Sequence, residues 1–317
     1  MSRPWHASVP MVCLLGSAAC ELQEVTLAEP QDLVIAEVVL RAGASRQLAM
    51  LHRTHGSEQG VPDARIEVLD DEGGSFVLLP AADSLCLLPS DSAGARASTC
   101  YAGHTPVNAV RADAAYDLLV ELPGGGLLTG STTLPGDFTL LQPAPGTCRL
   151  SPGETLDLAW SPADRTWAYI VETLLTGIRA PLAQRGIMIE QDSLRLLGLA
   201  VARNDTTILF PTEFGLFERF DPELTDALVL LQQGLLDGVD ADIVIGAADR
   251  NWVNWARGGN FNPSGFVQVP SVFGDGTGVF GSVVARTLRV TTRPDATLPS
   301  CRVAQEQPRA VELSRRS

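Results

Sequence analysis

Apolar and polar residues alternate over a short stretch near the middle of the chain, with the period of a β-strand. Within the range 147–172 (TCRLSPGETLDLAWSPADRTWAYIVE), Leu156, Leu158 and Trp160 alternate with an aspartate and an alanine. A period of two is typical of a strand with one buried face. A turn rich in Pro, Ala and Asp follows, and the run 168–172 (AYIVE) starts a second strand. The stretch therefore predicts the opening of a β-sandwich.

Strand-like runs also occur on both sides of this stretch. They cover residues 32–40, 47–52, part of 60–74, 76–79, 115–122, 205–210, 242–249 and 283–292. One segment between them has helical character, because Asp221 and Pro222 form a cap and first-turn signal and leucines then recur at helical spacing up to Leu235. The pattern therefore predicts a mainly β protein with a helix over 222–235.

The two central strands resemble the B and C strands of fibronectin type III domains, because Trp160 ends one strand and Tyr169 opens the next across a Ser-Pro turn. In that fold both rings fill the space between two sheets. Residues 242–249 resemble the sixth strand of the fold and residues 283–292 its last strand. The predicted helix and the long segment 252–281 depart from the family pattern.

Two earlier stretches resemble transthyretin-like, carboxypeptidase-regulatory-like domains. Residues 60–74 (GVPDARIEVLDDEGG) follow the V-x-G-A-x-V-x-V-x-D-x-x-G hairpin of that family, with Asp63 in place of the usual Gly. Residues 115–126 (AYDLLVELPGGG) match its Y-x-L-x-V-x-x-P-x-G strand and hairpin. Together the resemblances imply two Ig-like or transthyretin-like antiparallel β-sandwiches, the second with a helical insertion and a long aromatic, Gly-rich loop.

The length of 317 residues suits about two domains, and a Pro-rich run at 142–147 is a short linker between them. The expected organisation is a signal peptide (1–19), a lipidated tether (20–32), a carboxypeptidase-regulatory-like β-sandwich (33–141), the linker (142–147), a fibronectin type III-like β-sandwich (148–301) and a polar tail (302–317).

The N-terminus has the order of an export signal. Arg3 precedes the apolar run 9–15, which is too short to span a bilayer, and small residues follow up to Cys20. This resembles the lipobox of bacterial lipoproteins, in which the Cys is acylated, although Ser17 stands where the family usually has Leu. Glu21 follows instead of Asp, so the inner-membrane retention signal of enteric bacteria is missing. We expect a lipid anchor to the outer membrane, facing the periplasm or the cell surface, or a secreted protein if the signal peptide is cut without lipidation.

Four cysteines remain outside the signal peptide and the lipobox, and an even set in an exported chain predicts two disulfides. Position favours Cys86 with Cys100 and Cys148 with Cys301, because the first two fall in one predicted domain and the other two bracket the second domain. The long bridge would stabilise by up to about 5 kcal/mol in the chain-entropy model and the short one by about 3 kcal/mol. Free buried thiols and a Cys-rich metal site are the alternatives.

The charged residues exclude several functions. All 23 basic residues are Arg, so no Walker A lysine, Schiff-base lysine or lysine general base exists in this sequence. With a formal net charge of −14, the chain also lacks the basic field that nucleic-acid binding requires. We expect no nucleic-acid partner.

An aromatic, Gly-rich segment follows the predicted strand 242–249. Aromatic side chains on a loop that a rigid sandwich supports are typical of binding to a sugar, a peptide or a partner protein. Strict alternation would put two tryptophans of this segment on opposite faces, so we expect one buried ring and one exposed ring, the exposed one being Trp255. The alternative is that the aromatic residues only add a layer of core. The candidate binding residues are Trp252, Trp255, Phe261, Phe266 and Phe273.

Other motifs indicate chemistry only weakly. The acidic runs 70–72 and 240–242 would suit calcium, but neither has a ligand loop of recognised spacing, so solvated turns are expected. The run 274–282 (GDGTGVFGS) lacks the Lys and the following helix of a phosphate loop, and the chain has no G-x-S-x-G elbow. Three histidines are expected in surface loops rather than at a zinc site: His52, His55 and His104. We predict no catalytic residue, no metal site and no cofactor.

The order of lipobox, regulatory-like β-domain, Trp-bearing sandwich and the late segment around Asp249, Asn251 and 276–282 resembles a domain-of-unknown-function family of bacterial lipoproteins, often found with TonB-dependent outer-membrane receptors. The resemblance implies a non-enzymatic binding or accessory module at the cell envelope, with a membrane anchor and an outer-membrane protein partner such as a TonB-dependent receptor. The alternative is a secreted hydrolase or carbohydrate-processing accessory protein whose site is assembled from scattered acidic residues.

Overall fold

The computed structural model of this chain is mainly β, as the alternating pattern predicts. It describes residues 32–54, 60–86, 98–106, 109–199, 204–213, 222–258, 269–295 and 297–302. These residues belong to one compact unit that begins at Asp32. Within them, every helix is too short or too polar to cross a bilayer.

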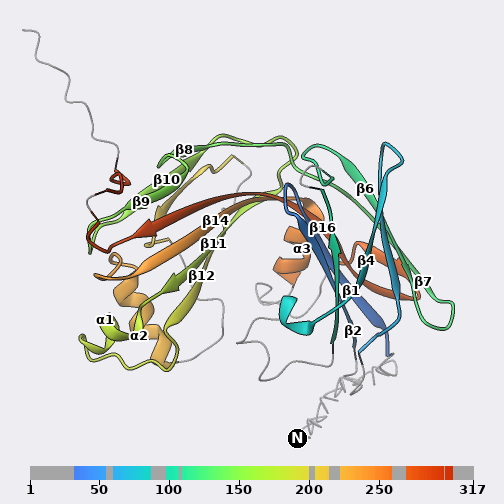
Figure 1. Cartoon of the computed structure of the whole chain (residues 1–317), viewed down its shortest axis with the longest axis horizontal. Helices are drawn as coiled ribbons and strands as arrows, with labels where there is room; N and C mark the ends of the chain where they lie inside the picture. Colours follow the sequence, from blue (N-terminus) through green and yellow to red (C-terminus); the bar gives the residue numbers. More distant parts are fainter. Residues whose placement is uncertain are drawn as a thin grey trace, which may run out of the picture. The chain divides into compact units, whose positions relative to one another are not determined.

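Nine strands of the larger sheet close into a ring (Figure 1). Their order is β1-β2-β5-β4-β3-β6-β7-β15-β16, and β16 pairs with β1 to complete it. Neighbours in the ring are antiparallel, except that β1 and β16 run parallel. The strands are β1 (Val34–Arg41), β2 (Arg46–Arg53), β3 (Arg65–Asp70), β4 (Ser75–Ala81), β5 (Ser98–His104), β6 (Ala115–Glu121), β7 (Leu127–Thr133), β15 (Val272–Gly274) and β16 (Gly276–Thr291).

Alternate residues of the ring strands are buried and form its core, which is why these segments alternate in sequence. On β6, Tyr116, Leu118 and Val120 are buried while the residues between them are partly or fully exposed. The hydroxyl of Tyr116 donates to the carbonyl of Ala109 (3.0 Å) and accepts the amide of Arg111 (2.9 Å). The tyrosine of the Y-x-L-x-V motif therefore fixes the turn that precedes its own strand.

The remaining strands form two layers. β12, β11 and β14 continue the larger sheet beyond β16, β9 pairs in parallel with β16, and a separate sheet has the order β13-β10-β8. The ring centroids of Trp160 on β10 and Tyr169 on β11 are 5.2 Å apart, and both side chains are buried between the layers. The bounds are β8 (Leu140–Gln142), β9 (Gly146–Arg149), β10 (Leu156–Trp160), β11 (Ala168–Thr176), β12 (Ser193–Leu199), β13 (Thr207–Phe210) and β14 (Asp240–Ala248).

The helices are η1 (Asp83–Leu85), α1 (Arg179–Ala183), α2 (Pro222–Leu231) and α3 (Arg250–Gly258). Helix α2 begins at the predicted residue but ends four residues before the predicted Leu235. At Gly234 the backbone has a φ of 137°, and a Cβ there would lie 2.4 Å from the backbone of Gly153. The φ of Gly234 lies outside the helical range, and only glycine fits so close to Gly153, so the helix cannot continue through this residue.

Strand β16 lies within the predicted range 148–301 but pairs with strands of both predicted ranges. Its first half, Gly276 to Val283, pairs with β1, and its second half, Val283 to Thr291, pairs with β14. The predicted linker 142–147 contains the end of β8 and the start of β9. The division into 33–141 and 148–301 stays a prediction, and the pairing adds that one continuous strand of the second range also pairs with a strand of the first.

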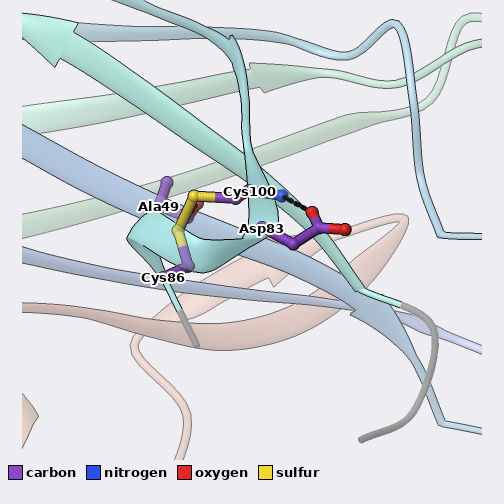
Figure 2. Close-up of a disulfide and its surroundings, with 4 residues drawn as sticks. All are labelled: Ala49, Asp83, Cys86 and Cys100. Carbon is purple, nitrogen blue, oxygen red and sulfur yellow. Dashed lines mark hydrogen bonds between the residues drawn. A yellow bond between two sulfur atoms is a disulfide. The ribbon is translucent and has the colours of Figure 1, made fainter. Parts of the chain in front are cut away.

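Two disulfides are present, with the predicted pairing. The sulfur atoms of Cys86 and Cys100 are 2.03 Å apart, and those of Cys148 and Cys301 are 2.10 Å apart. Figure 2 shows the first bridge, where the amide of Cys100 donates to Oδ1 of Asp83 at 3.4 Å. Disulfides are typical of compartments outside the reducing cytosol.

Candidate binding surface

The predicted aromatic loop begins as helix α3, which is a correction. Oδ1 of Asp249 accepts the amide of Trp252 (2.9 Å) and its carbonyl accepts the amide of Val253 (3.2 Å), so Asp249 is the N-cap. Because Trp252 and Trp255 are three residues apart on a helix, they lie on the same side of it. The prediction that they face opposite ways, with Trp255 exposed, is wrong because it assumed an extended chain.

Both tryptophans pack on the outer face of the ring. Trp255 is only 6% exposed and contacts Ile35 of β1 and Val279 of β16, and Trp252 packs against the same cluster. A Cβ on Gly281 would lie 2.8 Å from Cβ of Trp252, so the helix rests directly on β16. This burial favours the core interpretation of the two rings.

Helix α3 also covers the layered part of the molecule. Val253 is buried with Ala168 of β11 and Ala248 of β14, and Trp252 packs on this second cluster too. The helix therefore spans β1, β16, β14 and β11 and joins the ring to the layers.

A buried polar group lies beneath the start of α3. Oγ1 of Thr132 on β7 donates to Oδ2 of Asp249 (2.7 Å), and Oγ of Ser282 on β16 lies 3.0 Å from Thr132 Oγ1. All three residues are at most 5% exposed. Burial raises the pKa of Asp249, while the hydrogen bonds from Thr132 and from the Trp252 amide act in the opposite direction. The carboxylate therefore caps the helix and ties it to two strands.

Asn251 completes this connection. Its Nδ2 donates to the carbonyl of Ser131 on β7 and to the carbonyl of Phe280 on β16, both at 2.9 Å. It therefore bridges two ring strands where β15 no longer separates them, since β15 pairs with β7 only up to Gly130. Asp249 and Asn251, which stand out in the sequence, therefore connect the start of helix α3 to β7 and β16.

Two substitutions of Asp249 are expected to differ in their effect on stability. Asp249→Asn keeps an acceptor for the helix amide and can donate to Thr132, so the free energy of unfolding at pH 7 should change by less than about 1 kcal/mol. Asp249→Ala removes the cap and the acceptor of a buried hydroxyl, and should lower it by about 1–3 kcal/mol. Urea denaturation followed by circular dichroism measures both values.

The same variants test the pKa of Asp249. An unfolded Asp titrates at about 3.9, and burial raises the folded-state pKa above this value. The folded protein then binds the proton more tightly, so this group contributes stability that is complete below about pH 4 and is lost as the pH rises through the folded pKa. Relative to Asp249→Asn, the wild type should gain stability as the pH falls from 7 to 4. A constant difference would contradict the raised pKa.

One candidate aromatic residue is exposed. Phe273 on β15 is 58% exposed, while its neighbour Val272 is buried. Gly274 has a φ of 130°, and a Cβ there would lie 2.1 Å from the carbonyl of Leu127, so β15 is held tightly against β7. The ring of Phe273 is therefore presented to solvent on a fixed backbone. The other two candidate phenylalanines lie outside the described residues: Phe261 and Phe266.

The strand register places Phe273 in a row of outward side chains. Across β7, β6 and β3 the row continues with Thr129, Leu119 and Glu67. We call the outward residues of these four strands the Phe273 face. Its members are Arg65, Glu67, Leu69, Asp117, Leu119, Glu121, Leu127, Thr129, Ser131 and Phe273.

The sequence did not single out the leucines of the Phe273 face. Leu69 is 39% exposed and Leu127 is 42% exposed, and Leu119 is half-buried between them. Strands with one solvated face usually carry polar residues at outward positions. Once the inward residues of β3, β6 and β7 are assigned from the alternating pattern, a leucine at each of these outward positions indicates an exposed apolar surface.

The acidic runs do not form cation sites. In the turn 70–72, Arg111 lies 2.6 Å from the carboxylate of Glu72. Arg289 lies 3.6 Å from Asp240 and 3.7 Å from Asp242, so these carboxylates already face a guanidinium group. In the part of the chain that the structure describes, no group of three or more His, Cys, Asp or Glu residues is placed to hold a metal ion.

The two histidines of the predicted set that the structure describes, His52 and His104, lie apart. His52 lies within β2, not in a loop, and its Nε2 is 3.7 Å from Oε1 of Glu37 on β1. His104 ends β5 opposite Arg46, at the other end of β2. The third histidine of the predicted set, His55, lies outside the described residues.

The sequence matches no protein-family model and no curated protein. Among solved structures, it is similar to a DUF4785 family protein from Legionella pneumophila, with 10% identity, a TM-score of 0.20 and coverage of 67% of this chain and 51% of that chain. It is also similar to trypsin-activated alpha-2-macroglobulin from Escherichia coli, with 8% identity, a TM-score of 0.21 and coverage of 82% of this chain and 16% of that chain. A third similar structure is DIP-gamma IG1+IG2, with 8% identity, a TM-score of 0.19 and coverage of 83% of this chain and 98% of that chain. This chain thus spans about half of the Legionella protein. These TM-scores are too low to indicate a function.

Proposed function

We propose that this protein is a lipid-anchored binding module of the bacterial cell envelope, which acts without catalysis by holding an outer-membrane protein at the Phe273 face. A TonB-dependent receptor is the partner type that the sequence resemblance implies. The observation that carries the proposal is the exposure of Phe273 on a strand whose backbone is fixed between β7 and β16. A ring so exposed adds little to the core, and exposed aromatic side chains are frequent anchors of protein interfaces.

Rigid presentation supports a binding role. Association costs free energy for every side chain and segment that must be ordered, and a preformed strand avoids much of that cost. Phe273 is followed by Gly274, which brings β15 close to Leu127, and by Asp275, whose carboxylate accepts the Leu127 amide at 2.8 Å. The anchor is therefore held in place before a partner arrives.

The proposed anchoring to the outer membrane depends on Cys20, which lies outside the described residues. Asp32, where the compact unit begins, is twelve positions after Cys20. An extended chain of that length reaches about 40 Å. A lipidated Cys20 would then let the β-structure stand away from the membrane and approach an integral protein beside it.

We also propose that the two parts are carboxypeptidase-regulatory-like and fibronectin type III-like. The hydrogen bonds of Tyr116 support the first assignment, since this tyrosine carries the family motif. The contact between Trp160 and Tyr169 from facing sheets supports the fibronectin type III-like assignment, since in that fold both rings fill the space between the two sheets.

Photo-cross-linking from the Phe273 position in living cells tests the proposed function. We expect p-benzoylphenylalanine at this position to link an integral outer-membrane protein, identified by mass spectrometry. Leu141 on β8 is the matched control, because it is 63% exposed and lies outside the Phe273 face. In parallel, Phe273→Ala should lower capture of that protein at least about tenfold and change the free energy of unfolding by less than about 0.5 kcal/mol.

Two results would contradict the proposed function. One is the same set of cross-linked proteins from the Phe273 and Leu141 positions, which would indicate random contact. The other is no linked membrane protein from the Phe273 position although the protein is folded and anchored. Cys20→Ala serves as the control for lipid anchoring, because an unlipidated form should no longer partition into detergent.

A further inference from the structure

The apolar residues of the Phe273 face form a bent stripe over four strands, which runs diagonally from Leu69 to Leu127 and turns back to Phe273 in the row of Leu119. Leu69 on β3, Leu119 on β6, Leu127 on β7 and Phe273 on β15 are successive diagonal neighbours in the strand register. Strands lie about 4.8 Å apart, so the stripe extends over roughly 14 Å of sheet. Three of its four side chains are more than a third exposed. It is thus large enough to receive several side chains of a partner.

Carboxylates surround this stripe. Glu67, Asp117 and Glu121 lie on the Phe273 face, and Asp275 lies beside it. Arg65 is the one cationic residue among the members of the face. The guanidinium group of Arg65 is 2.9 Å from Glu67 and 3.7 Å from Glu121, so its charge is already shared between two acids. Four negative charges and one positive charge leave 1 − 4 = −3 on the surface around the stripe.

The spacing of these groups defines what fits them. Along β6 the outward residues are Asp117, Leu119 and Glu121, an acid, an apolar residue and an acid, with about 6.7 Å between successive positions. An extended segment laid on the sheet presents its own side chains at i, i+2 and i+4 with the same interval. A segment that reads cation, apolar, cation on one side therefore matches the charges and the stripe together.

We infer that the Phe273 face binds a cationic β-strand or hairpin of its partner protein, with Arg or Lys residues flanking an apolar one at alternate positions. The inference rests on the proposed function and names the chemistry of the partner. The cationic side chains meet Asp117 and Glu121, while the apolar residue contacts Leu119 and its stripe.

Other occupants fit this face less well. A second copy of the chain carries a formal net charge of −14, so two such faces repel each other. Anionic lipid and nucleic acid are disfavoured for the same reason. A purely apolar ligand would take water from the carboxylates without replacing their hydrogen bonds, which costs free energy. Charge complementarity therefore selects a basic partner.

Three cyclised hairpin peptides that differ only in their flanking residues test the inference. One side of each peptide presents Arg-Leu-Arg, Gln-Leu-Gln or Glu-Leu-Glu, and binding to the full-length protein is measured by fluorescence anisotropy. We expect the Arg peptide to bind at least about tenfold more tightly than the Gln peptide, and the Glu peptide not to bind. The preference for Arg should shrink as salt is raised from 0.05 to about 0.5 M.

Variants of the protein separate this site from general attraction to an acidic chain. The double substitution Asp117→Asn and Glu121→Gln should weaken Arg-peptide binding about tenfold. The matched control, Glu190→Gln with Asp226→Asn, removes the same charge from exposed positions outside the Phe273 face and should leave the affinity within about twofold. Equal losses in the two double variants, or equal binding of the Arg and Gln peptides, would overturn the inference.

The peptide-binding experiment and the cross-linking experiment can fail separately, so the inference and the proposed function are tested independently. If cross-linking at the Phe273 position recovers a membrane protein but the peptides show no charge preference, the function stands and the cationic partner is wrong. If the peptides rank as expected but no membrane protein is captured, the recognition chemistry stands and the proposed partner class is wrong.

Discussion

Trp255→Ala is expected to lower the free energy of unfolding by about 3–5 kcal/mol, the range for large aromatic residues truncated in a core. Trp255 is 6% exposed and fills the space between α3, Ile35 and Val279. Trp252→Ala should have an effect of the same order, because Trp252 packs on this cluster and on the one around Val253. Guanidinium denaturation followed by far-ultraviolet circular dichroism measures both.

Trp167→Ala is the control for this prediction. The ring of Trp167 is 37% exposed and lies 5.4 Å from the guanidinium carbon of Arg250, a cation–π contact of about 0.5–1 kcal/mol. Its substitution should therefore destabilise much less than that of Trp255. If Trp255→Ala and Trp167→Ala were equally mild, α3 would not be packed on the sheet as described. A sharp difference between Trp252→Ala and Trp255→Ala would instead restore the opposite-face prediction.

Removing the long disulfide should have the other large effect. Cys148→Ala with Cys301→Ala opens a loop of 153 residues, and the chain-entropy model assigns up to about 5 kcal/mol to that constraint on the unfolded chain. Both cysteines are buried, so the vacated volume adds to the loss. The paired variant should melt well below the wild type in a calorimeter.

The short disulfide calibrates this result. Cys86 and Cys100 are 14 residues apart, which corresponds to about 3 kcal/mol in the same model. Cys86→Ala with Cys100→Ala should therefore destabilise less than the long-bridge variant. The reverse order would show that native packing around the bridges, and not the length of the closed loop, controls their contribution.

Local patterns predicted the elements that depend on local residues. The alternation of Leu156, Leu158 and Trp160 corresponds to strand β10, and the proline at 222 with the following leucines corresponds to α2. In both cases the side that the sequence marks as apolar is the side that tertiary packing covers. The positions of the four cysteines within the predicted domains similarly matched the observed pairing.

Helix α3 was missed although its signal is local. Asp249 is a good N-cap, and apolar residues at 252, 253, 255 and 256 have helical spacing. The helix is hard to recognise in the sequence because it lies between a strand and a Gly-rich segment, which together favour a loop. The prediction for the two tryptophans failed with it, since the side on which a residue lies depends on the period of the element.

The first half of β16 was beyond local reasoning. Its glycines suggested a loop, but a Cβ on Gly278 would lie 2.0 Å from the carbonyl of Ala36 on β1. The glycine is there because two backbones approach closely, and the partner strand lies more than 200 residues earlier in the chain. The exposure of Phe273 follows from the same long-range pairing, so the sequence could nominate this ring but not place it.

The parallel ladder between β1 and β16 also bears on mechanical strength. It runs in register from Val34 opposite Gly276 to Arg41 opposite Val283. An N-terminal anchor would pull β1 from the end where both strands begin, whereas a load applied at the C-terminal end of β16 pulls the other way. Such opposed tension slides the strands along each other, so the ladder's hydrogen bonds are strained together instead of opening one after another like a zipper. Under a load of this geometry, the molecule would thus resist extension through this pair of strands.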